Sequence, residues 1–120
     1  MDEILRTYGI PDRIGLYYSG NNAALHVDIQ LKYENIDTYI NYYTGTKDID
    51  KYNTSEGVIY CPEEFDVNIV ELHLGKHPFN MVSEGIPILK GTGLSEQDFY
   101  TLITENPSAC LTLHQKAFYP

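Results

Sequence analysis

Strict alternation of hydrophobic and polar residues marks the segment from Leu25 to Tyr33 as a β-strand. Its odd-numbered residues are Leu, Val, Ile, Leu and Tyr, and the residues between them are His, Asp, Gln and Lys. A period of two places one set of side chains in a core and the other in water. Similar β-rich stretches lie on either side, at Arg13–Ser19 and at 36–44. With turns at Ser19–Asn22 and Glu34–Asn35, the three stretches predict an antiparallel meander.

Three later stretches also predict strands: 58–61, 67–74 and 109–118. In the middle one, Val67, Ile69, Leu72 and Leu74 are expected to point inward, although Val70 breaks the alternation. The polar stretch 45–57 predicts a long loop, as does the glycine- and proline-rich stretch 75–93 with a brief strand at 86–89.

Helix signals occur near both ends of the chain. Asp2–Tyr8 predicts a short helix capped by Asp2 and ended by Gly9 and Pro11. Near the C-terminus, Ser95 and Asp98 have the spacing of a capping box, which predicts a helix over 96–105.

This order of elements predicts an α+β fold rather than parallel βαβ units, because helices and strands are segregated along the chain. We expect a twisted antiparallel sheet of five or six strands with two short helices on one face. The length of 120 residues predicts a single domain over 1–120.

The net charge of the chain limits the classes of molecule that it is expected to bind. Seventeen acidic and eight basic residues give a net charge of −9, and no two basic residues are adjacent. Nucleic acids and anionic lipids bind to clustered Lys and Arg, so the sequence argues against both. An acidic surface suits solubility or a basic protein partner. No transmembrane segment is predicted, because no apolar run approaches the roughly 20 residues that span a bilayer. No signal peptide is predicted, because the start of the sequence has no basic region followed by an apolar one.

Tyrosine dominates the aromatic residues, with eleven Tyr, four Phe and no Trp. Tyr offers apolar area with a polar tip, which suits a half-buried sheet face as well as a contact surface.

The two cysteines, Cys61 and Cys110, allow one pairing. A disulfide and a pair of buried free thiols are both compatible with their spacing. Neither cysteine belongs to a CxxC motif or to a zinc-binding cysteine cluster.

Candidate chemistry rests on histidines and carboxylates. His26 with Asp28, and Glu71 with His73, each share one face of a predicted strand, an arrangement that acid–base catalysis uses. His73 and His77 have the spacing of two metal ligands on a helix, but Gly75 and Pro78 argue against a helix there.

Three acidic residues, Glu63, Glu64 and Asp66, follow Pro62. Their spacing is not that of an EF-hand loop. No phosphate-binding, nucleophile-elbow or zinc-protease motif is present. The sequence therefore predicts no catalytic, cofactor-binding or metal site, and a protein that is not an enzyme.

Several short motifs together resemble a bacterial pattern. They are Tyr8-Gly9-Ile10-Pro11 after a short helix, Val58-Ile59-Tyr60-Cys61-Pro62, Leu94-Ser95-Glu96-Gln97-Asp98-Phe99-Tyr100 and a final Cys110. The order is similar to that of uncharacterised bacterial lipoprotein-like or secreted domains. The opening module alone, a short helix ending in Tyr8-Gly9-Ile10-Pro11 and entering a strand at Ile14, resembles the small outer-membrane-assembly lipoproteins and the β-lactamase-inhibitor-like fold that they share. The resemblance implies an envelope or secreted setting and a Cys61–Cys110 disulfide, without a known activity. The chain departs from it by having no lipobox cysteine near its start.

From these observations we expect a non-enzymatic binding or accessory module, extracytoplasmic or secreted, that contacts a protein partner through a Tyr-bearing sheet face or loops. One alternative is an inhibitor or immunity-type protein that binds a basic enzyme. Another is a small hydrolase that uses His26, Asp28, Glu71 or His73, which requires at least two of them to converge in a pocket. A cytoplasmic location is the alternative setting.

Overall fold

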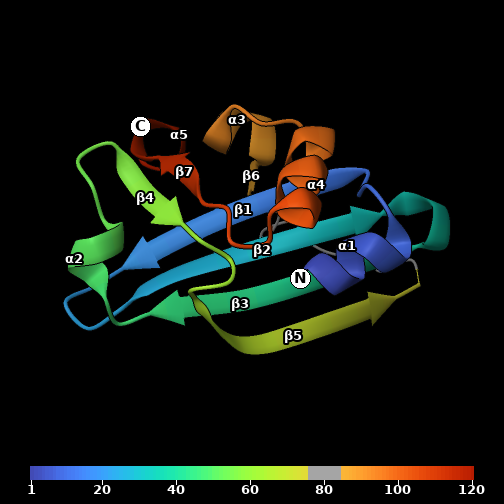
Figure 1. Ribbon diagram of the computed structural model, residues 1–120, viewed down its shortest axis with the longest axis horizontal. Coiled ribbons are helices and arrows are strands. Elements are labelled where there is room, and N and C mark those ends of the chain that lie inside the picture. Colours follow the sequence, from blue (N-terminus) through green and yellow to red (C-terminus); the bar gives the residue numbers. More distant parts are fainter. Residues whose placement is uncertain (76–84) are drawn as a thin grey trace.

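The computed structural model describes residues 1–75 and 85–120 of the chain (Figure 1). Its centre is a five-stranded antiparallel sheet with the order β5-β3-β2-β1-β6, accompanied by a two-stranded antiparallel sheet of β4 and β7. The strands are β1 (Arg13–Gly20), β2 (Leu25–Tyr33), β3 (Thr38–Thr46), β4 (Gly57–Tyr60), β5 (Asp66–Leu74), β6 (Ile86–Pro87) and β7 (Leu111–His114). The helices are α1 (Asp2–Tyr8), α2 (Ile49–Tyr52), α3 (Ile88–Thr92), α4 (Glu96–Glu105), α5 (Gln115–Phe118) and the 3-10 turn η1 (Glu34–Ile36). The predicted α+β class and antiparallel sheet are confirmed.

The meander forms because its alternation is regular and its turns are short. β2 has the predicted bounds, and all five of its odd-numbered side chains are buried. At the first turn, Asn21 Oδ1 accepts hydrogen bonds from the backbone N–H groups of Ala23 and Ala24. At the second turn η1 ends at Asp37, which adopts a left-handed conformation and returns the chain into β3.

A single layer covers one face of the five-stranded sheet. α1, α3, α4 and the β4–β7 sheet all lie on the same side in Figure 1, and their buried side chains join the core of β1, β2 and β3. Leu5 of α1, Phe99 of α4 and Leu113 of β7 are each fully buried there. The other face, which we call the outward face, is covered by no helix or strand among the described residues.

Both predicted helices are present, with different start signals. α4 begins with the predicted capping box, in which Ser95 Oγ accepts from the Asp98 backbone N–H and Asp98 Oδ2 accepts from the Ser95 N–H. The predicted cap of α1 is wrong: Asp2 is the first helical residue, and Met1 at the N-cap makes no side-chain hydrogen bond. Arg6 Nη2 donates to the Thr104 carbonyl oxygen and joins the two helices.

Three predicted segments differ in the structure. The loop expected over 45–57 contains the end of β3 and helix α2. The brief strand at 86–89 ends at Pro87, where the chain enters α3. The strand expected over 109–118 is confined to β7, because its partner β4 begins at Gly57, opposite His114, and the chain then turns into α5.

β5 corrects the prediction about inward-facing residues. Its register on β3 shifts at Tyr43 and Thr44, where Ile69 and Val67 are the partners and Asn68 is the extra residue of a β-bulge. Val70, Leu72 and Leu74 therefore share the covered face with Val67, whereas Ile69 points to the outward face. None of these five side chains is buried, with exposed fractions between 50% and 66%.

Candidate functional site

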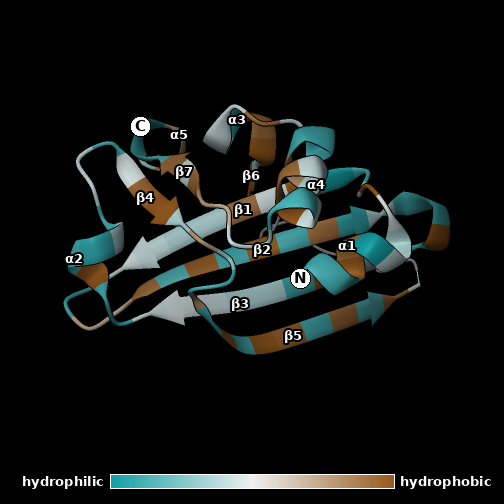
Figure 2. Ribbon diagram, in the orientation of Figure 1, coloured by the Kyte–Doolittle hydropathy of each residue, from teal (hydrophilic) through white to brown (hydrophobic). Residues whose placement is uncertain are grey.

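The β5 edge is the most exposed hydrophobic part of the sheet. We use this name for Val70, Leu72 and Leu74 together with the backbone side of β5 that faces away from β3. Among the described strands β5 pairs with β3 alone. Figure 2 shows the hydrophobic and hydrophilic bands alternating along β5 as they do along β2.

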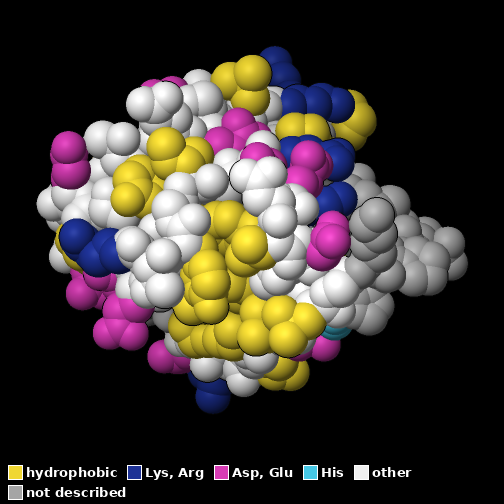
Figure 3. Space-filling view, turned by 90° about the vertical axis from the view of Figure 1, so that its right-hand side faces the viewer, with side chains coloured by type: hydrophobic (Ala, Val, Ile, Leu, Met, Phe, Trp, Pro, Cys, Tyr) yellow, Lys and Arg dark blue, Asp and Glu magenta, His cyan; other side chains and the backbone are white. Residues whose placement is uncertain are grey.

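Hydrophobic side chains form a continuous band on the side of the molecule where α1 and the end of β5 lie (Figure 3). The elements on that side carry several exposed hydrophobic residues: Tyr8 on α1, Ile36 on η1, and Val70, Leu72 and Leu74 on β5. A contiguous patch of exposed apolar side chains often marks a binding surface on a soluble protein. The β5 edge is thus one candidate contact surface.

The outward face carries the second candidate, which consists of polar side chains. β-pairing places Asp28 of β2 directly opposite Tyr43 of β3, and Asn41 of β3 directly opposite Glu71 of β5. We call Asp28, Asn41, Tyr43 and Glu71 the polar cluster. Tyr17 of β1 flanks it, directly opposite Asp28.

The electrostatics of the polar cluster are unusual for a sheet surface. Burial raises the pKa of the Asp28 carboxyl above its ordinary value, and the nearby His26 only partly opposes this. A hydrogen bond with Glu71, together with burial and the charges of Glu71 and Asp28, raises the pKa of the Tyr43 phenol to about 12. Asn41 is only 5% exposed. Its Oδ1 atom accepts no hydrogen bond from the part of the chain that the structure describes.

The predicted acid–base residues all lie on the outward face, but the two histidines are far apart. His26 is opposite Gly45 and His73 is opposite Tyr39, six residues apart along β3. At about 3.3 Å per residue this separation is roughly 20 Å. His26 and His73 therefore do not converge on one substrate.

Each histidine has its own local surroundings. His73 stacks on the Tyr39 ring with centroids 4.4 Å apart, and its Nε2 atom lies 3.9 Å from Glu71 Oε2. His26 lies over Gly45, where an added methyl group would approach its Nδ1 atom to 3.1 Å. Ser19 of β1 is directly opposite His26, and the described structure has no hydrogen bond between their side chains, while the ring lies close to Gly45 of β3. This is not the arrangement of a nucleophile and its base. His77, the second residue of the predicted metal pair, lies outside the described residues.

The cysteines form the Cys61–Cys110 disulfide, with Cα atoms 4.2 Å apart. The bridge continues the β4–β7 ladder by one position beyond the Tyr60–Leu111 pair. It therefore fastens the end of β4 to the start of β7 within the covering layer.

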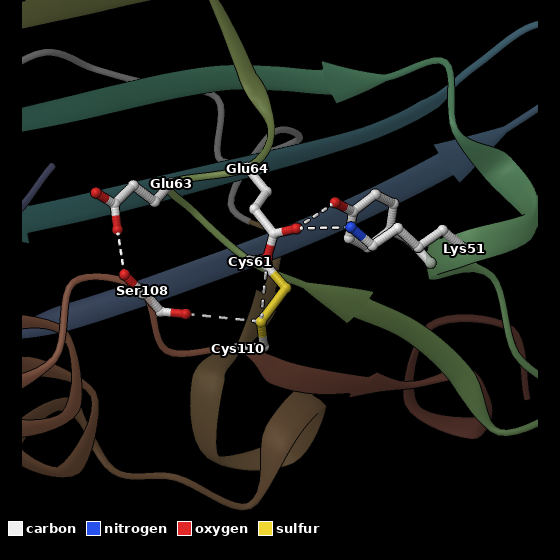
Figure 4. Close-up of a disulfide and its surroundings, with 7 residues drawn as sticks. Lys51, Cys61, Glu63, Glu64, Ser108 and Cys110 are labelled. Atoms are coloured by element: carbon white, nitrogen blue, oxygen red, sulfur yellow. Dashed lines mark hydrogen bonds and ion pairs between the residues drawn. A yellow bond between two sulfur atoms is a disulfide. The ribbon is translucent and has the colours of Figure 1, made fainter.

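Hydrogen bonds from the acidic turn surround this disulfide (Figure 4). Glu64 Oε1 accepts from Lys51 Nζ at 3.0 Å and from the Tyr52 hydroxyl at 2.7 Å, and the Ser108 hydroxyl donates to Glu63 at 2.8 Å. The bonds from Tyr52 and Lys51 lower the pKa of the Glu64 carboxyl. The acidic turn thus joins α2 through Glu64 and the segment before Cys110 through Glu63, on either side of the disulfide.

Within the described residues, Cys61, Glu64 and Cys110 are the one group of three potential metal ligands whose ligand atoms lie within 4.8 Å of one another. In the oxidised chain the two sulfur atoms are bonded to each other, so they offer no thiolate to a metal.

Sequence reasoning selected Asp28 and Glu71 but missed Asn41 and Tyr43. Their signal was the alternation of β3, in which Tyr39, Asn41 and Tyr43 share one face. The register that places them between Asp28 and Glu71 depends on η1 and on the pairing of β5, which no local pattern specifies.

No helix in the described part of the chain is long and apolar enough to cross a membrane. Comparison with protein-family models, with curated proteins and with solved structures found no match.

Proposed function

We propose that this protein is a non-enzymatic binding module that receives an extended segment of a protein partner along the β5 edge. The observation that carries the proposal is the row of exposed hydrophobic side chains on an edge strand. A strand at the edge of a sheet presents unpaired N–H and C=O groups to an incoming strand. Addition of a strand in this way is a recurrent mode of peptide recognition, in which side-chain contacts on alternate positions supply specificity.

The chemistry of the partner follows from the two faces of β5. On the covered side, Val70, Leu72 and Leu74 offer apolar contacts to every second residue of an added strand. On the outward side, Glu71 offers a carboxylate, and the whole chain carries a charge of −9. The matching occupant is an extended segment in which hydrophobic residues alternate with Lys or Arg. An inhibitor of a basic enzyme would be one specific form of this function.

The setting that we propose is the cell envelope or the secreted space. The Cys61–Cys110 disulfide supports it, because disulfides persist in oxidising compartments. The motif resemblance to bacterial envelope and secreted domains points the same way.

A synthetic nine-residue peptide of alternating valine and lysine tests the β5 edge. We expect micromolar binding by NMR titration, with the largest shifts and new amide protection in β5. Leu72→Lys should weaken binding at least tenfold, because it replaces an apolar contact with a like charge. Leu89→Lys is the matched control, since Leu89 is a similarly exposed leucine on α3.

Two further peptides separate backbone pairing from charge. Methylation of alternate backbone nitrogens should abolish binding, whereas a valine–glutamate peptide should bind more weakly than the valine–lysine peptide. The proposal fails if the valine–lysine peptide shows no binding at millimolar concentration, or if Leu72→Lys and Leu89→Lys weaken it equally.

A further inference from the structure

The polar cluster presents hydrogen-bond acceptors in excess of donors. Asp28 and Glu71 contribute carboxylates, and Asn41 contributes an Oδ1 atom that is unpaired within the described structure. Leaving a buried amide oxygen without a donor costs free energy, so such groups in native proteins call for an explanation. Here the acceptor lies between Gln30 of β2 and Glu71 of β5, its direct partners in the two ladders, and one diagonal position from Asp28.

Asp28 is a second polar group of the cluster whose burial costs free energy. Its carboxylate is half-buried, and the raised pKa shows that its surroundings disfavour the negative charge. Stability alone would favour asparagine at this position. Costly polar groups of this type are retained where they bind or react.

The carboxylates of the cluster do not form a metal site by themselves. Among the described residues, Asp28 and Glu71 belong to no group of three His, Cys, Asp or Glu side chains whose ligand atoms lie within 4.8 Å of one another. A larger planar group with several donors spans separated acceptors better. Guanidinium has five N–H donors in a fixed fork and stacks on aromatic rings. Tyr17 and Tyr43 supply such rings at the border of the cluster, where a cation also gains from the π-face.

We propose that Asp28, Asn41, Tyr43 and Glu71 form a binding site for a guanidinium group. Glu71 and Asp28 supply charge, Asn41 Oδ1 supplies the central acceptor, and the Tyr43 ring borders the site. This site shares Glu71 with the outward side of β5 but does not depend on the proposed function, although an arginine of a strand bound at β5 is one source of the group. A free guanidinium compound is the other source.

NMR titration with agmatine, a small guanidinium compound, tests the site directly. We expect the side-chain amide signals of Asn41 to shift, and binding to be weaker for butylamine and weakest for tetramethylammonium, which has no N–H donor. The capped tripeptide Val-Arg-Val provides the second source. If the tripeptide binds more strongly than agmatine, the site is assigned to the arginine of a peptide. If the two bind equally, the site is assigned to a free guanidinium compound.

Substitutions in the polar cluster test which side chains contribute to agmatine binding. Asn41→Val, Glu71→Gln and Asp28→Asn should each weaken agmatine binding by roughly fivefold or more, while Glu105→Gln on α4 should leave it unchanged. Circular dichroism confirms folding, and the two isosteric variants carry the test if Asn41→Val does not fold.

Cross-controls separate this site from the β5 edge. Leu72→Lys should leave agmatine binding intact, and Asn41→Val should leave the valine–lysine peptide bound. The inference is overturned if agmatine causes no shift at Asn41 up to tens of millimolar, or if Glu105→Gln weakens binding as much as Glu71→Gln.

Discussion

β2 and β5 are both nine-residue strands with alternating hydrophobic residues, yet they differ in burial. Leu31 of β2 is fully buried under the covering layer, whereas Leu72 of β5 is 55% exposed on the same side of the same sheet. The covering layer of α1, α4 and the β4–β7 sheet ends before it reaches β5. Hydrophobic alternation thus specifies a strand and its two faces, while burial depends on what is packed on top. A strand that has hydrophobic alternation but no covering layer is therefore a candidate site for binding a partner.

The largest expected effect comes from the matched pair of leucines. Leu31→Ala should lower the free energy of unfolding by about 3–4 kcal/mol, because it leaves a cavity in a packed core. Leu72→Ala should cost less than about 1 kcal/mol, since the side chain is mostly in water. Urea denaturation measures both values. Equal losses would show that β5 is covered in solution and would remove the contrast between the strands.

Removing the disulfide tests what keeps β2 covered. The double variant Cys61→Ala, Cys110→Ala should lose about 2–4 kcal/mol, because the bridge closes a loop of about 50 residues and fastens β4 to β7. Hydrogen exchange should accelerate in β4 and β7 and leave β5 unchanged. Wild-type protein treated with reductant is the control. If reduction leaves the urea midpoint unchanged, the bridge does not hold the cover in place.

The smallest expected effect concerns the outward side of β2. Burial raises the pKa of Asp28, so the stability that this group contributes is present below the unfolded pKa near 3.8 and is lost as pH rises through the raised folded pKa. Asp28→Asn should therefore raise the Tm by about 1–3 °C at pH 7 and by much less near pH 3. Asp66→Asn, at an exposed aspartate of β5, should change little at either pH. A destabilised Asp28→Asn variant at pH 7 would show that the carboxylate is well paired.

Local sequence patterns predicted much of this fold because its main signals are local. The alternation of β2 and the capping box of α4 each act within a few residues, and both are present as expected. The Cys61–Cys110 disulfide also formed, although spacing left free thiols equally open. The limit of β7 could not be predicted, because it is set by the length of a distant strand, β4.

The sequence identified some residues of the two candidate surfaces but not how these residues are arranged. Asp28 and Glu71 were identifiable as outward carboxylates, but their position around Asn41 depends on the register of three strands. The inward assignment of Ile69 failed because one extra residue, Asn68, inverts the alternation. Exposure of the β5 edge depends on where the covering layer ends, which is a tertiary property.

The bulge at Asn68 has a consequence for self-assembly. A long, straight and hydrophobic edge invites fibril growth, and bulges are one of the devices by which natural sheets interrupt it. Here the irregularity divides β5, so that only the stretch from Ile69 to Leu74 offers a regular ladder. Deleting Asn68 would restore the full ladder while leaving the faces of its neighbours unchanged. Asn68 thus keeps the regular part of the exposed edge short, which leaves less straight backbone for a second copy of the chain to pair with.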